Sequence, residues 1–450
     1  MFVRTDVGKV FGVELIQSSA MNAALELWDN VSSEKPPWRD ADDDIKPYGM
    51  GKHITDYRAR LVCLDIGIAV SGSPRADYLQ TICDDLIKRL PDKVADAERM
   101  GGIAIKWNGD SWDFALPGEF GITKQDGNGN ITGAIFAEYI THGMDHYTRL
   151  EYHRFRDGLY VITNKAFRNR TMGSGQYTLG AEIPLTEVDE WAEMQPEVQI
   201  EQLETPLFAF FRLPGANIID PTSPLGMSAF ANALPELEAL DVALSRKNGE
   251  IADSKHITFV DQAAIQYANA HNLKLPRFIK GLGVSTDNSK PVTEHVPTVL
   301  TDARVKDINF DLSMAGVKCG FSEGVFVLDG QTGMMTATQV ESDDRDTIQT
   351  IKADRDALRC AVEQAIKGAD ALTTLLGKAP LGEYEVNFNW GDITYNFEED
   401  KASWKNYASQ GWVPLWLYFV KFEGMGEEEA KKMVAEASAN QKERGLFDEE

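Results

Sequence analysis

One serine in the sequence has the spacing of a nucleophile. Gly320, Ser322 and Gly324 form a GxSxG pattern, which in hydrolases places a reactive serine on a sharp turn between a strand and a helix. Here a strand-like run, residues 325–328, follows the serine instead of preceding it. Because this setting is reversed, we interpret the match as chance, and no catalytic residue is expected.

Three histidines could together hold a metal ion. His142, His146 and His153 lie close in sequence to Asp145 and Glu151, and imidazole and carboxylate groups are common zinc ligands. If one strand carries His146 and His153, their odd separation points them to opposite faces. Cross-strand polar residues are therefore the favoured interpretation, and neither a metal nor another cofactor is expected.

An acidic turn imitates part of a calcium-binding loop. Residues 126–130 (DGNGN) fit its first half, but Ile131 stands where the loop needs glycine and Ala137 where it needs glutamate. A hairpin turn explains the same residues. The phosphate-binding pattern GxxxxGK[ST] and the zinc-hydrolase pattern HExxH are both missing. The common motifs of nucleotide and zinc chemistry therefore give no support for an enzyme.

The tryptophans leave one alternative open. There are nine of them, enough for a carbohydrate-binding or carbohydrate-active protein. They include Trp107, Trp112, Trp390 and Trp412, and they are scattered among apolar residues, which favours places in the core.

The charge of the chain is strongly negative and uneven. The 450 residues carry 45 Lys and Arg against 70 Asp and Glu, a net charge of −25. This argues against a protein that wraps duplex DNA, which needs a basic surface. Residues 181–240 hold eleven acids and one base, Arg212, and are expected to form a solvated face. Residues 255–308 hold seven bases and five acids, so this segment is mildly positive.

The sequence favours a soluble protein of a reducing compartment. Its first residues lack the layout of a signal peptide, and its longest apolar run, residues 412–420, is too short for a membrane span. Four cysteines lie far apart without a CxxC pair, and we expect free, mostly buried thiols.

The periodicity of apolar residues predicts helices and strands along the chain. The first hundred residues indicate helices; one carries Leu79, Ile82, Leu86 and Leu90 on a single face and is expected to end at Pro91. Short strands separated by turn residues follow and indicate antiparallel hairpins; they are predicted at 102–107, 112–116, 131–141, 146–155 and 159–164. This order of elements predicts the α+β class.

Helices dominate the second half. We expect a helix over 228–253, which Pro235 either kinks or begins, and a compact excursion over 255–308. Apolar residues keep helical spacing over 336–376, with Gly377 as the C-cap. A strand pair, 384–390 and 393–397, leads to two or three closing helices, the last over about 427–444.

Three tracts resemble a known family. Residues 211–217 (FRLPGAN), which lead into 223–233 (SPLGMSAFANA), and residues 336–342 (TATQVES) are similar to tracts of the portal proteins of tailed bacteriophages, of the siphophage type. Upstream, residues 149–153 (RLEYH) and Trp191 fit the same family's wing domain. The resemblance spans most of the chain.

The resemblance implies a non-enzymatic ring subunit, usually one of a dodecamer, at one vertex of the viral head. Double-stranded DNA passes through such a ring, pumped in by a separate terminase. The expected partners are further copies of the chain, the terminase, a head–tail adaptor, and the major capsid and scaffold proteins, with no membrane. The expected location is the virion, and the host cytoplasm during assembly. Another head protein is the second alternative, although scaffolds are typically mostly coiled coil.

The resemblance also divides the chain into parts of a portal subunit. In order, these are the wing (1–227), a stem helix (228–254), the clip (255–308), a second stem helix (309–322), the tunnel-loop region (323–335), a long kinked helix (336–378), wing return strands (379–402) and a helical crown (403–450).

Three groups of site residues are implied by this division. The tunnel loop would present Asp329, Gln331, Thr332, Met334 and Met335 to DNA, the clip would dock partners through Lys274, Arg277 and Lys280, and the stem would carry Glu236, Asp241, Arg246 and Lys247. A channel that lets DNA slide needs few cations, because phosphate contacts by Lys and Arg supply most nonspecific affinity. The acidity of the chain is compatible with that task.

Overall fold

The computed structural model describes most of the chain. The described residues are 4–16, 18–41, 44–169, 179–254, 257–261, 266, 270–271, 279–282, 292–295, 300–327, 345–391, 397–410, 413–423, 425–428 and 430–436. The chain forms two compact units, 1–391 and 392–450, which are considered one at a time. Helices and mostly antiparallel sheets are both present, so the α+β class is confirmed.

Five helices open the first unit: α1 (Arg4–Phe11), α2 (Ser19–Ser32), α3 (Pro37–Ala41), α4 (Met50–Val62) and α5 (Pro74–Met100). The predicted stripe of α5 is buried, but the expectation that Pro91 ends this helix was wrong. Pro91 removes one helical hydrogen bond. Val94 and Ala97 continue the buried stripe beyond it, and the burial of these two turns outweighs that loss.

Two strands from opposite ends of the unit form a small sheet. β1 (Gly67–Ser71) pairs antiparallel with β14 (Glu385–Asn389), with Gly67 opposite Asn389. The strand expected at 384–390 is confirmed, and within the described residues it pairs with β1, a strand that the sequence did not predict. The expected second strand of the pair was 393–397. Residues 393–396 lie outside the described residues, and Phe397 begins a helix. A short strand carries no local signal of a partner that lies hundreds of residues away.

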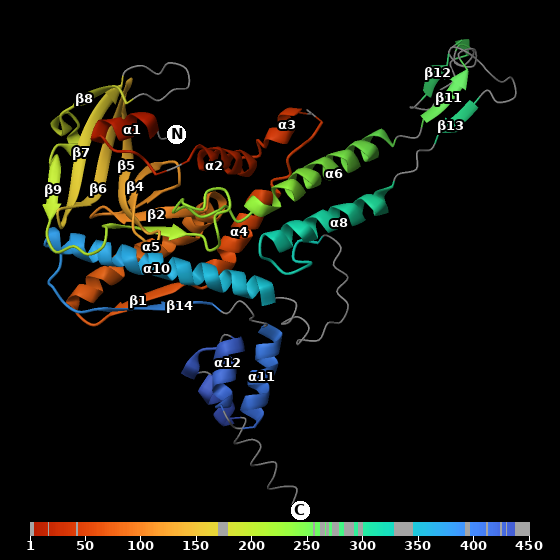
Figure 1. Ribbon diagram of the computed structural model, residues 1–450. Helices are drawn as coiled ribbons and strands as arrows, with labels where there is room; N and C mark the ends of the chain where they lie inside the picture. Colours follow the sequence, from red (N-terminus) through yellow and green to blue (C-terminus); the bar gives the residue numbers. More distant parts are fainter. Residues whose placement is uncertain are drawn as a thin grey trace, which may run out of the picture. The chain divides into compact units, whose positions relative to one another are not determined.

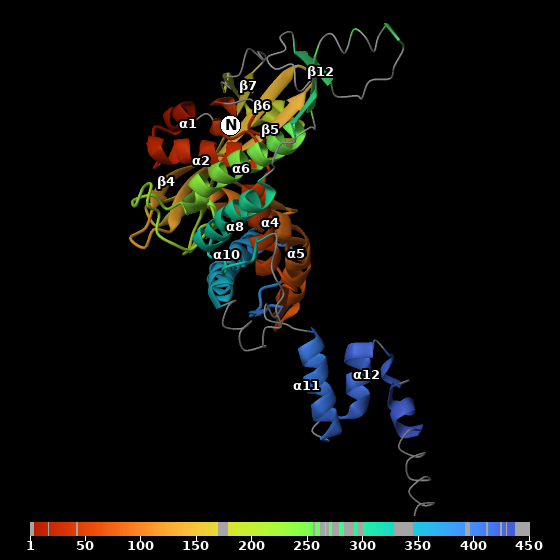
Figure 2. The same cartoon turned by 90° about the vertical axis from the view of Figure 1, so that its right-hand side faces the viewer.

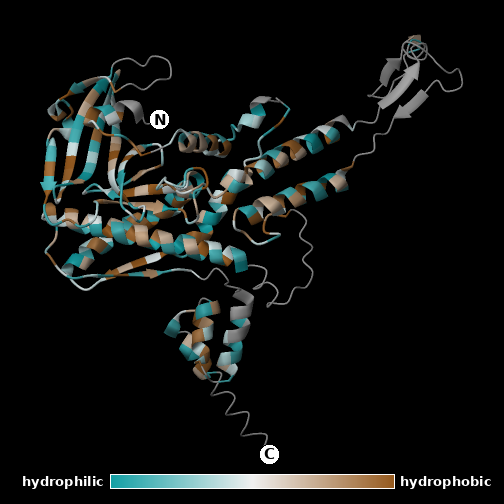
Figure 3. Cartoon of the chain, viewed as in Figure 1, coloured by the Kyte–Doolittle hydropathy of each residue, from teal (hydrophilic) through white to brown (hydrophobic). Residues whose placement is uncertain are grey.

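Two antiparallel sheets form the centre of this unit. One has the order β10 (Phe208–Arg212), β2 (Gly102–Trp107), β3 (Trp112–Ala115). The six-stranded sheet runs through β4 (Phe120–Gln125), β5 (Ile131–His142), β6 (Asp145–Arg156), β7 (Leu159–Asn169) and β8 (Ala181–Ile183), and β9 (Glu197–Ile200) also pairs with β7. Hydrophilic and hydrophobic residues alternate along β5 to β7 (Figure 3). The predicted strands are confirmed, whereas β4, β8, β9 and β10 were not predicted.

The calcium-like segment is the turn of the β4–β5 hairpin, as expected. The Asp126 carboxylate accepts hydrogen bonds from the backbone N–H groups of Asn128 and Asn130, both at 2.8 Å. The carboxylate is thereby occupied in closing the turn.

The acidic segment after β8 is a solvated face, as predicted. It contains two 3₁₀ turns, η1 (Leu185–Glu187) and η2 (Asp189–Trp191). Most of its acids are exposed, whereas Leu185, Val188 and Trp191 point inward and form a small cluster against Ala166.

Two long helices flank the clip segment in the chain. α6 (Leu234–Asp253) begins later than the expected Ser228, after the 3₁₀ turn η3 (Ala231–Ala233), and Pro235 lies in its first turn. α8 (Thr301–Lys318) begins earlier than the expected residue 309, so the expected clip boundary at 308 falls inside a helix. Between them in sequence lies a three-stranded sheet with the order β12 (Ile279–Leu282), β11 (Ile257–Asp261), β13 (Val292–His295).

The longest helix is α10 (Arg345–Leu375), with 31 residues. It is continuous in the described part and packs on β10, β2, α4 and α5 (Figure 1). The expected kinked segment 336–344 lies outside the described residues. Gly377 has φ +62°, and Lys378 N–H donates to the Thr373 carbonyl. These contacts confirm the predicted glycine C-cap.

The main core joins the sheets to the bases of the two flanking helices. It contains Trp28, Phe120 and Phe208, together with Leu240 of α6 and Leu312 of α8. The bases of α6 and α8 are therefore part of the same folded body as the sheets.

The second unit contains α11 (Phe397–Ser409) and α12 (Leu415–Glu423). Trp404 packs on Phe422, and Lys401 lies 3.0 Å from Glu423. Closing helices were predicted here, but the expected return strands over 379–402 end in a helix.

Candidate functional site

The predicted tunnel loop and most of the predicted clip surface fall in undescribed segments. Asp329, Gln331, Thr332, Met334 and Met335 lie outside the described residues, as do Lys274 and Arg277. Lys280 is a residue of β12 and is paired with Phe259 of β11.

The predicted stem residues can be placed, and they belong to a helix pair. Glu236 in the first turn of α6 forms an ion pair with Lys318 in the last turn of α8. Near the opposite end, Glu250 of α6 forms an ion pair with Arg304 of α8. Since the start of one helix meets the end of the other, α6 and α8 are antiparallel. They lie side by side in both views (Figures 1 and 2).

Asp241 fastens α6 to the N-terminal part of the unit. Its carboxylate accepts hydrogen bonds from Trp38 Nε1 at 2.9 Å and from the backbone N–H of Tyr48 at 3.0 Å. Burial raises the pKa of this carboxyl, and the two hydrogen bonds oppose the shift. Asp241 is 5% exposed, so it lies inside the first unit and not on an open surface.

The other two predicted stem residues differ in exposure. Arg246 is exposed and Lys247 is half-buried. The neighbouring Ser245 accepts a hydrogen bond from the backbone N–H of Lys46 at 2.9 Å, so a loop of the N-terminal part follows α6 beyond Asp241. Of the four predicted stem residues, Arg246 is the one most accessible to an external partner.

The outer face of α8 carries an exposed apolar stripe. Ala303, Phe310 and Val317 follow one another at intervals of seven residues, which places them on one side of the helix. Phe310 is 64% exposed and Val317 is 47% exposed. Such a stripe on a helix that already packs against α6 indicates a second packing surface.

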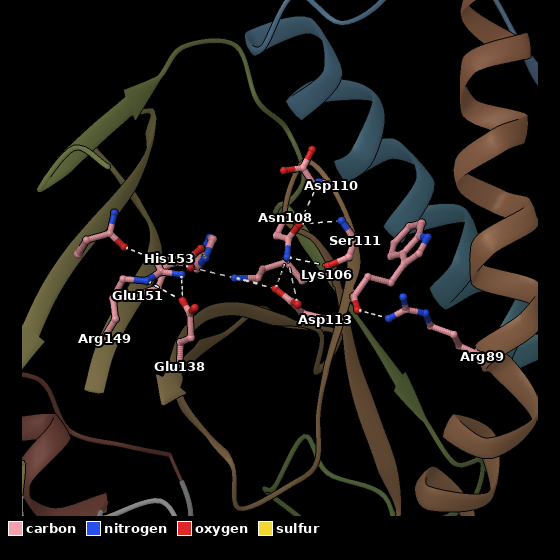
Figure 4. Close-up of polar contacts among 12 residues, drawn as sticks. Arg89, Lys106, Asn108, Asp110, Ser111, Asp113, Glu138, Arg149, Glu151 and His153 are labelled. Atoms are coloured by element: carbon pink, nitrogen blue, oxygen red, sulfur yellow. Dashed lines mark hydrogen bonds and ion pairs between the residues drawn. The ribbon is translucent and has the colours of Figure 1, made fainter. Parts of the chain in front are cut away.

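A polar cavity of about 550 Å³ lies where the two central sheets face each other. It is lined by Lys106, Asn108 and Asp113 from β2, β3 and the turn between them, and by Arg149 and Glu151 from β6 (Figure 4). The sequence analysis did not anticipate this cluster. Its signal was the alternation of charged residues along β6, because every second residue of a strand lies on one face.

Glu151 is the centre of the cluster. Its carboxylate lies 2.9 Å from Lys106 Nζ, 2.9 Å from Arg149 Nη1 and 2.5 Å from His153 Nε2. Burial would raise the pKa of this carboxyl, but Lys106, His153 and Arg149 outweigh burial and hold the pKa well below its usual range. Glu151 is therefore a fixed negative charge.

His153 continues the network into the core. Burial lowers the pKa of its imidazole, so the ring is neutral near pH 7 and carries one proton. The Leu207 N–H donates to the Tyr160 oxygen at 3.1 Å. The Tyr160 hydroxyl then donates to His153 Nδ1 at 2.9 Å, and Nε2–H donates to Glu151. Tyr160 is fully buried, so this chain of hydrogen bonds ends in the core, away from any substrate.

The histidines do not converge on a metal site. His142 pairs with Glu190, His146 bonds Thr141 across the β5–β6 hairpin, and His153 faces the core. The cross-strand interpretation holds for His146, whereas His142 pairs with a 3₁₀ turn and His153 is buried. Within the described ranges, no group of three His, Cys, Asp or Glu side chains is arranged to hold a metal ion.

The serine of the GxSxG pattern has a structural place. Ser322 is 5% exposed. Its N–H donates to Thr347 Oγ1 at 2.8 Å, and its Oγ accepts from the Thr347 N–H at 3.3 Å, so it stabilises the first turns of α10. Residues 323–326 form a turn in place of the expected strand, because Gly324 adopts φ +89°. The interpretation of the match as chance agrees with this geometry.

The thiols also match the sequence prediction. Cys63, Cys83 and Cys319 are free and buried, and Cys360 is free and exposed. Burial raises the pKa of each buried thiol to about 12, which makes all three poor nucleophiles. None of the helices in the described part is long and apolar enough to cross a bilayer.

Comparisons with protein-family models and with curated proteins find no match to this chain.

Proposed function

We propose that this chain is a subunit of a phage portal ring, which serves as a conduit for double-stranded DNA and as a docking platform for a terminase and a head–tail adaptor. One observation carries the proposal. An antiparallel helix pair, α6 and α8, is rooted in an α+β body and brackets a small sheet in the chain. A stem that brackets a clip has this order of elements.

The contacts at the base of the pair suit a rigid stem. Leu240 and Leu312 belong to the main core, and Asp241 receives two hydrogen bonds from the N-terminal part. The ion pairs Glu236–Lys318 and Glu250–Arg304 keep the two helices in register along their length. In the proposed ring, this stem connects the body to the clip.

The exposed stripe of α8 supports self-association. Phe310 and Val317 are exposed although they belong to α8, which packs against α6. In the proposed ring, the next copy covers this stripe with another part of its surface, because a rotation that repeats around an axis joins different faces of neighbouring copies. The partner of the stripe is therefore a second copy of this chain.

The charge distribution supports a conduit that does not retain its cargo. With 70 Asp and Glu against 45 Lys and Arg, the net charge of −25 opposes retention of DNA, because phosphate contacts by Lys and Arg are the main source of nonspecific DNA affinity. Arg246 and Lys247 of α6 are the cations that we assign to the stem part of the channel, and the tunnel loop around Thr332 is the proposed contact with the moving duplex.

The burial of three tryptophans favours the portal proposal over the carbohydrate alternative. Trp28, Trp112 and Trp191 are among the largest fully buried side chains, so they cannot stack on a sugar. The charged groups of the cavity are paired with one another around Glu151. In the proposed function, the chemistry of packaging belongs to the terminase, and this chain acts by assembly.

The mass of the purified particle tests the proposal. Light scattering and negative-stain imaging of the full chain, alone and co-expressed with the head proteins, are expected to show a ring. Phe310→Asp should reduce ring formation, whereas Met144→Asp, at a residue that is 83% exposed on the β5–β6 hairpin, serves as the control. A monomer of 50.0 kDa under all these conditions would refute the ring.

A further inference from the structure

Three buried charged residues meet at one point inside the first unit. Arg58 of α4 forms a bidentate pair with Asp354 of α10, with Nε–Oδ2 at 2.7 Å and Nη2–Oδ1 at 2.8 Å. Its third nitrogen, Nη1, donates to the backbone carbonyl of Cys319 at 3.2 Å. Glu98 of α5 completes the group, with Oε2 at 3.0 Å from Arg58 Nε. Four segments, α4, α5, α10 and the C-cap of α8, are joined here.

The group has one cation for two carboxyl groups. The side chains of Glu98 and Asp354 are 0% exposed, and that of Arg58 is 9% exposed. The Nε–H of Arg58 is directed to Asp354, and neither oxygen of Glu98 receives a hydrogen bond within the described part of the chain. If both acids were ionised, the group would carry a net negative charge buried away from solvent, which is strongly unfavourable.

Within the described residues, Arg58 is the cation that acts on Glu98. The charged and titratable groups that face Glu98 in the described part are Arg58, Asp354, Cys63 at the C-cap of α4, and Cys319 at the C-cap of α8. The nearby Arg355 donates to the carbonyls of Leu61 and Val62. Its guanidinium is therefore committed to the end of α4.

The pKa directions agree with this geometry. Burial raises the pKa of Glu98 well above its usual value, Asp354 raises it further, and Arg58 opposes both without cancelling them. Burial also raises the pKa of Asp354, against the attraction of Arg58. Two acids therefore compete for one guanidinium, and the one without hydrogen bonds retains its proton more strongly.

We propose that Glu98 carries a proton at neutral pH, and that its release loosens the joint at which α4, α5, α10 and the end of α8 meet. The proposal is independent of the portal assignment, because it rests on the Arg58 group alone. Ionised Glu98 would place a second negative charge beside Asp354 in a buried site. Local opening of the end of α8, which admits water, relieves that repulsion.

The sign of the pH dependence follows from linkage. In the unfolded chain Glu98 ionises near its ordinary pKa of 4.5, whereas the folded chain keeps the proton to higher pH. The folded state therefore binds more protons above that value. Its folding equilibrium constant should fall by up to about tenfold per pH unit until the folded pKa is reached.

Glu98→Gln tests the proton directly, because glutamine is close in shape to a neutral carboxyl group and does not titrate. Urea unfolding of the full chain is followed between about pH 5 and about pH 9. The folding equilibrium constant of wild type should fall with rising pH more steeply than that of Glu98→Gln, by up to tenfold per pH unit. The control Asp92→Asn, which changes an exposed acid on the same helix, should show the same pH dependence as wild type. An equal slope in wild type and Glu98→Gln would overturn the proposal.

Cys319 reports the local opening. Cys319 is 2% exposed, and its backbone carbonyl accepts a hydrogen bond from Arg58. The joint must therefore open before a thiol reagent reaches the Cys319 thiol. Mass spectrometry of labelled peptides should show faster labelling of Cys319 in wild type than in Glu98→Gln at alkaline pH, with equal labelling of the exposed Cys360. Equal labelling of Cys319 in both proteins would contradict the opening.

A readout in the unmutated protein covers the case in which Glu98→Gln does not fold. Infrared spectra of the protein with ¹³C-carboxyl glutamate should contain the isotope-shifted stretch of one protonated carboxyl at neutral pH, which disappears as the pH rises. Spectra in which all glutamates are ionised at neutral pH would overturn the proposal.

Discussion

Glu236 and Lys318 are 82 residues apart in the chain and form an ion pair where the first turn of α6 meets the last turn of α8. The contact fixes the direction of α8 relative to α6, and Glu250–Arg304 repeats it near the other end. Both pairs are partly exposed, and such pairs contribute about 1 kcal/mol or less. The pairs hold α6 and α8 in register, while the apolar residues of both helices that belong to the main core supply most of the stability.

The register contact can be tested by exchange of charge. Glu236→Lys should destabilise the protein by about 1 kcal/mol, because it places two cations together, and Lys318→Glu added to it should restore most of the loss. Urea unfolding of the two single variants and the double variant gives the coupling free energy. A double variant that shows only the sum of the two losses would contradict the contact.

The fastening of α6 depends on Asp241. Replacement by Ala removes the acceptor for the Trp38 indole and for the Tyr48 N–H, and should cost about 1–3 kcal/mol, since two donors lose their partner. Trp38 fluorescence should change in parallel. Glu238→Ala, at an exposed residue of the same helix, is the control. A loss in Asp241→Ala no larger than in this control would show that the contact does not hold the helix.

The cavity network should determine the response to acid. The pKa values of Glu151 and His153 are both lowered in the folded protein, so the unfolded state takes up protons first as the pH falls. Stability should therefore decrease below the ordinary pKa of histidine, 6.5, and further below that of glutamate, 4.5.

Glu151→Gln separates the two contributions. It should cost about 3 kcal/mol at neutral pH, because Lys106 and Arg149 lose their shared counter-charge, and it should remove the lower part of the acid limb. Glu138→Gln, whose side chain is 45% exposed, should cost less. A Glu151→Gln variant with the acid limb of wild type would contradict the assignment of a fixed negative charge.

The clip surface is a prediction from sequence alone. Replacement of Lys274, Arg277 and Lys280 by Glu should weaken binding to the terminase or to the adaptor, because it reverses the local charge of a mildly positive segment. Packaging efficiency and pull-down of either partner measure the effect, with Arg359→Glu on α10 as the control. Undiminished packaging in the triple variant would refute the docking role.

The sequence predicted those elements whose signals are local. Alternation located five strands, and the Asp126 turn and the Gly377 cap were identified by residue type. The prediction that α5 ends at Pro91 was wrong because it used a local signal, the proline. The helix continues because apolar residues beyond Pro91 pack in the core, and this packing is not visible in the local sequence. The partner of β14 was missed for a similar reason. β1 has only five residues, and the pairing of strands that are distant in sequence depends on the tertiary structure.

The candidate site shows the same division. Periodicity predicted a helix that contains Glu236 and Asp241, but not that Asp241 would face Trp38 or that Glu236 would meet Lys318. The Glu151 cluster needed Lys106, which comes from another sheet. Glu98 gave no signal as a single acid in an amphipathic helix, because its burial depends on Arg58 and Asp354 from two other helices.

The mass of the assembled particle distinguishes a ring from a monomer. Multi-angle light scattering of the full chain, with negative-stain imaging and with co-expressed head proteins where needed, should give a closed ring whose mass is a multiple of 50.0 kDa, and Phe310→Asp should shift it toward smaller species. A single species of 50.0 kDa in every condition, unchanged by Phe310→Asp, would contradict the account.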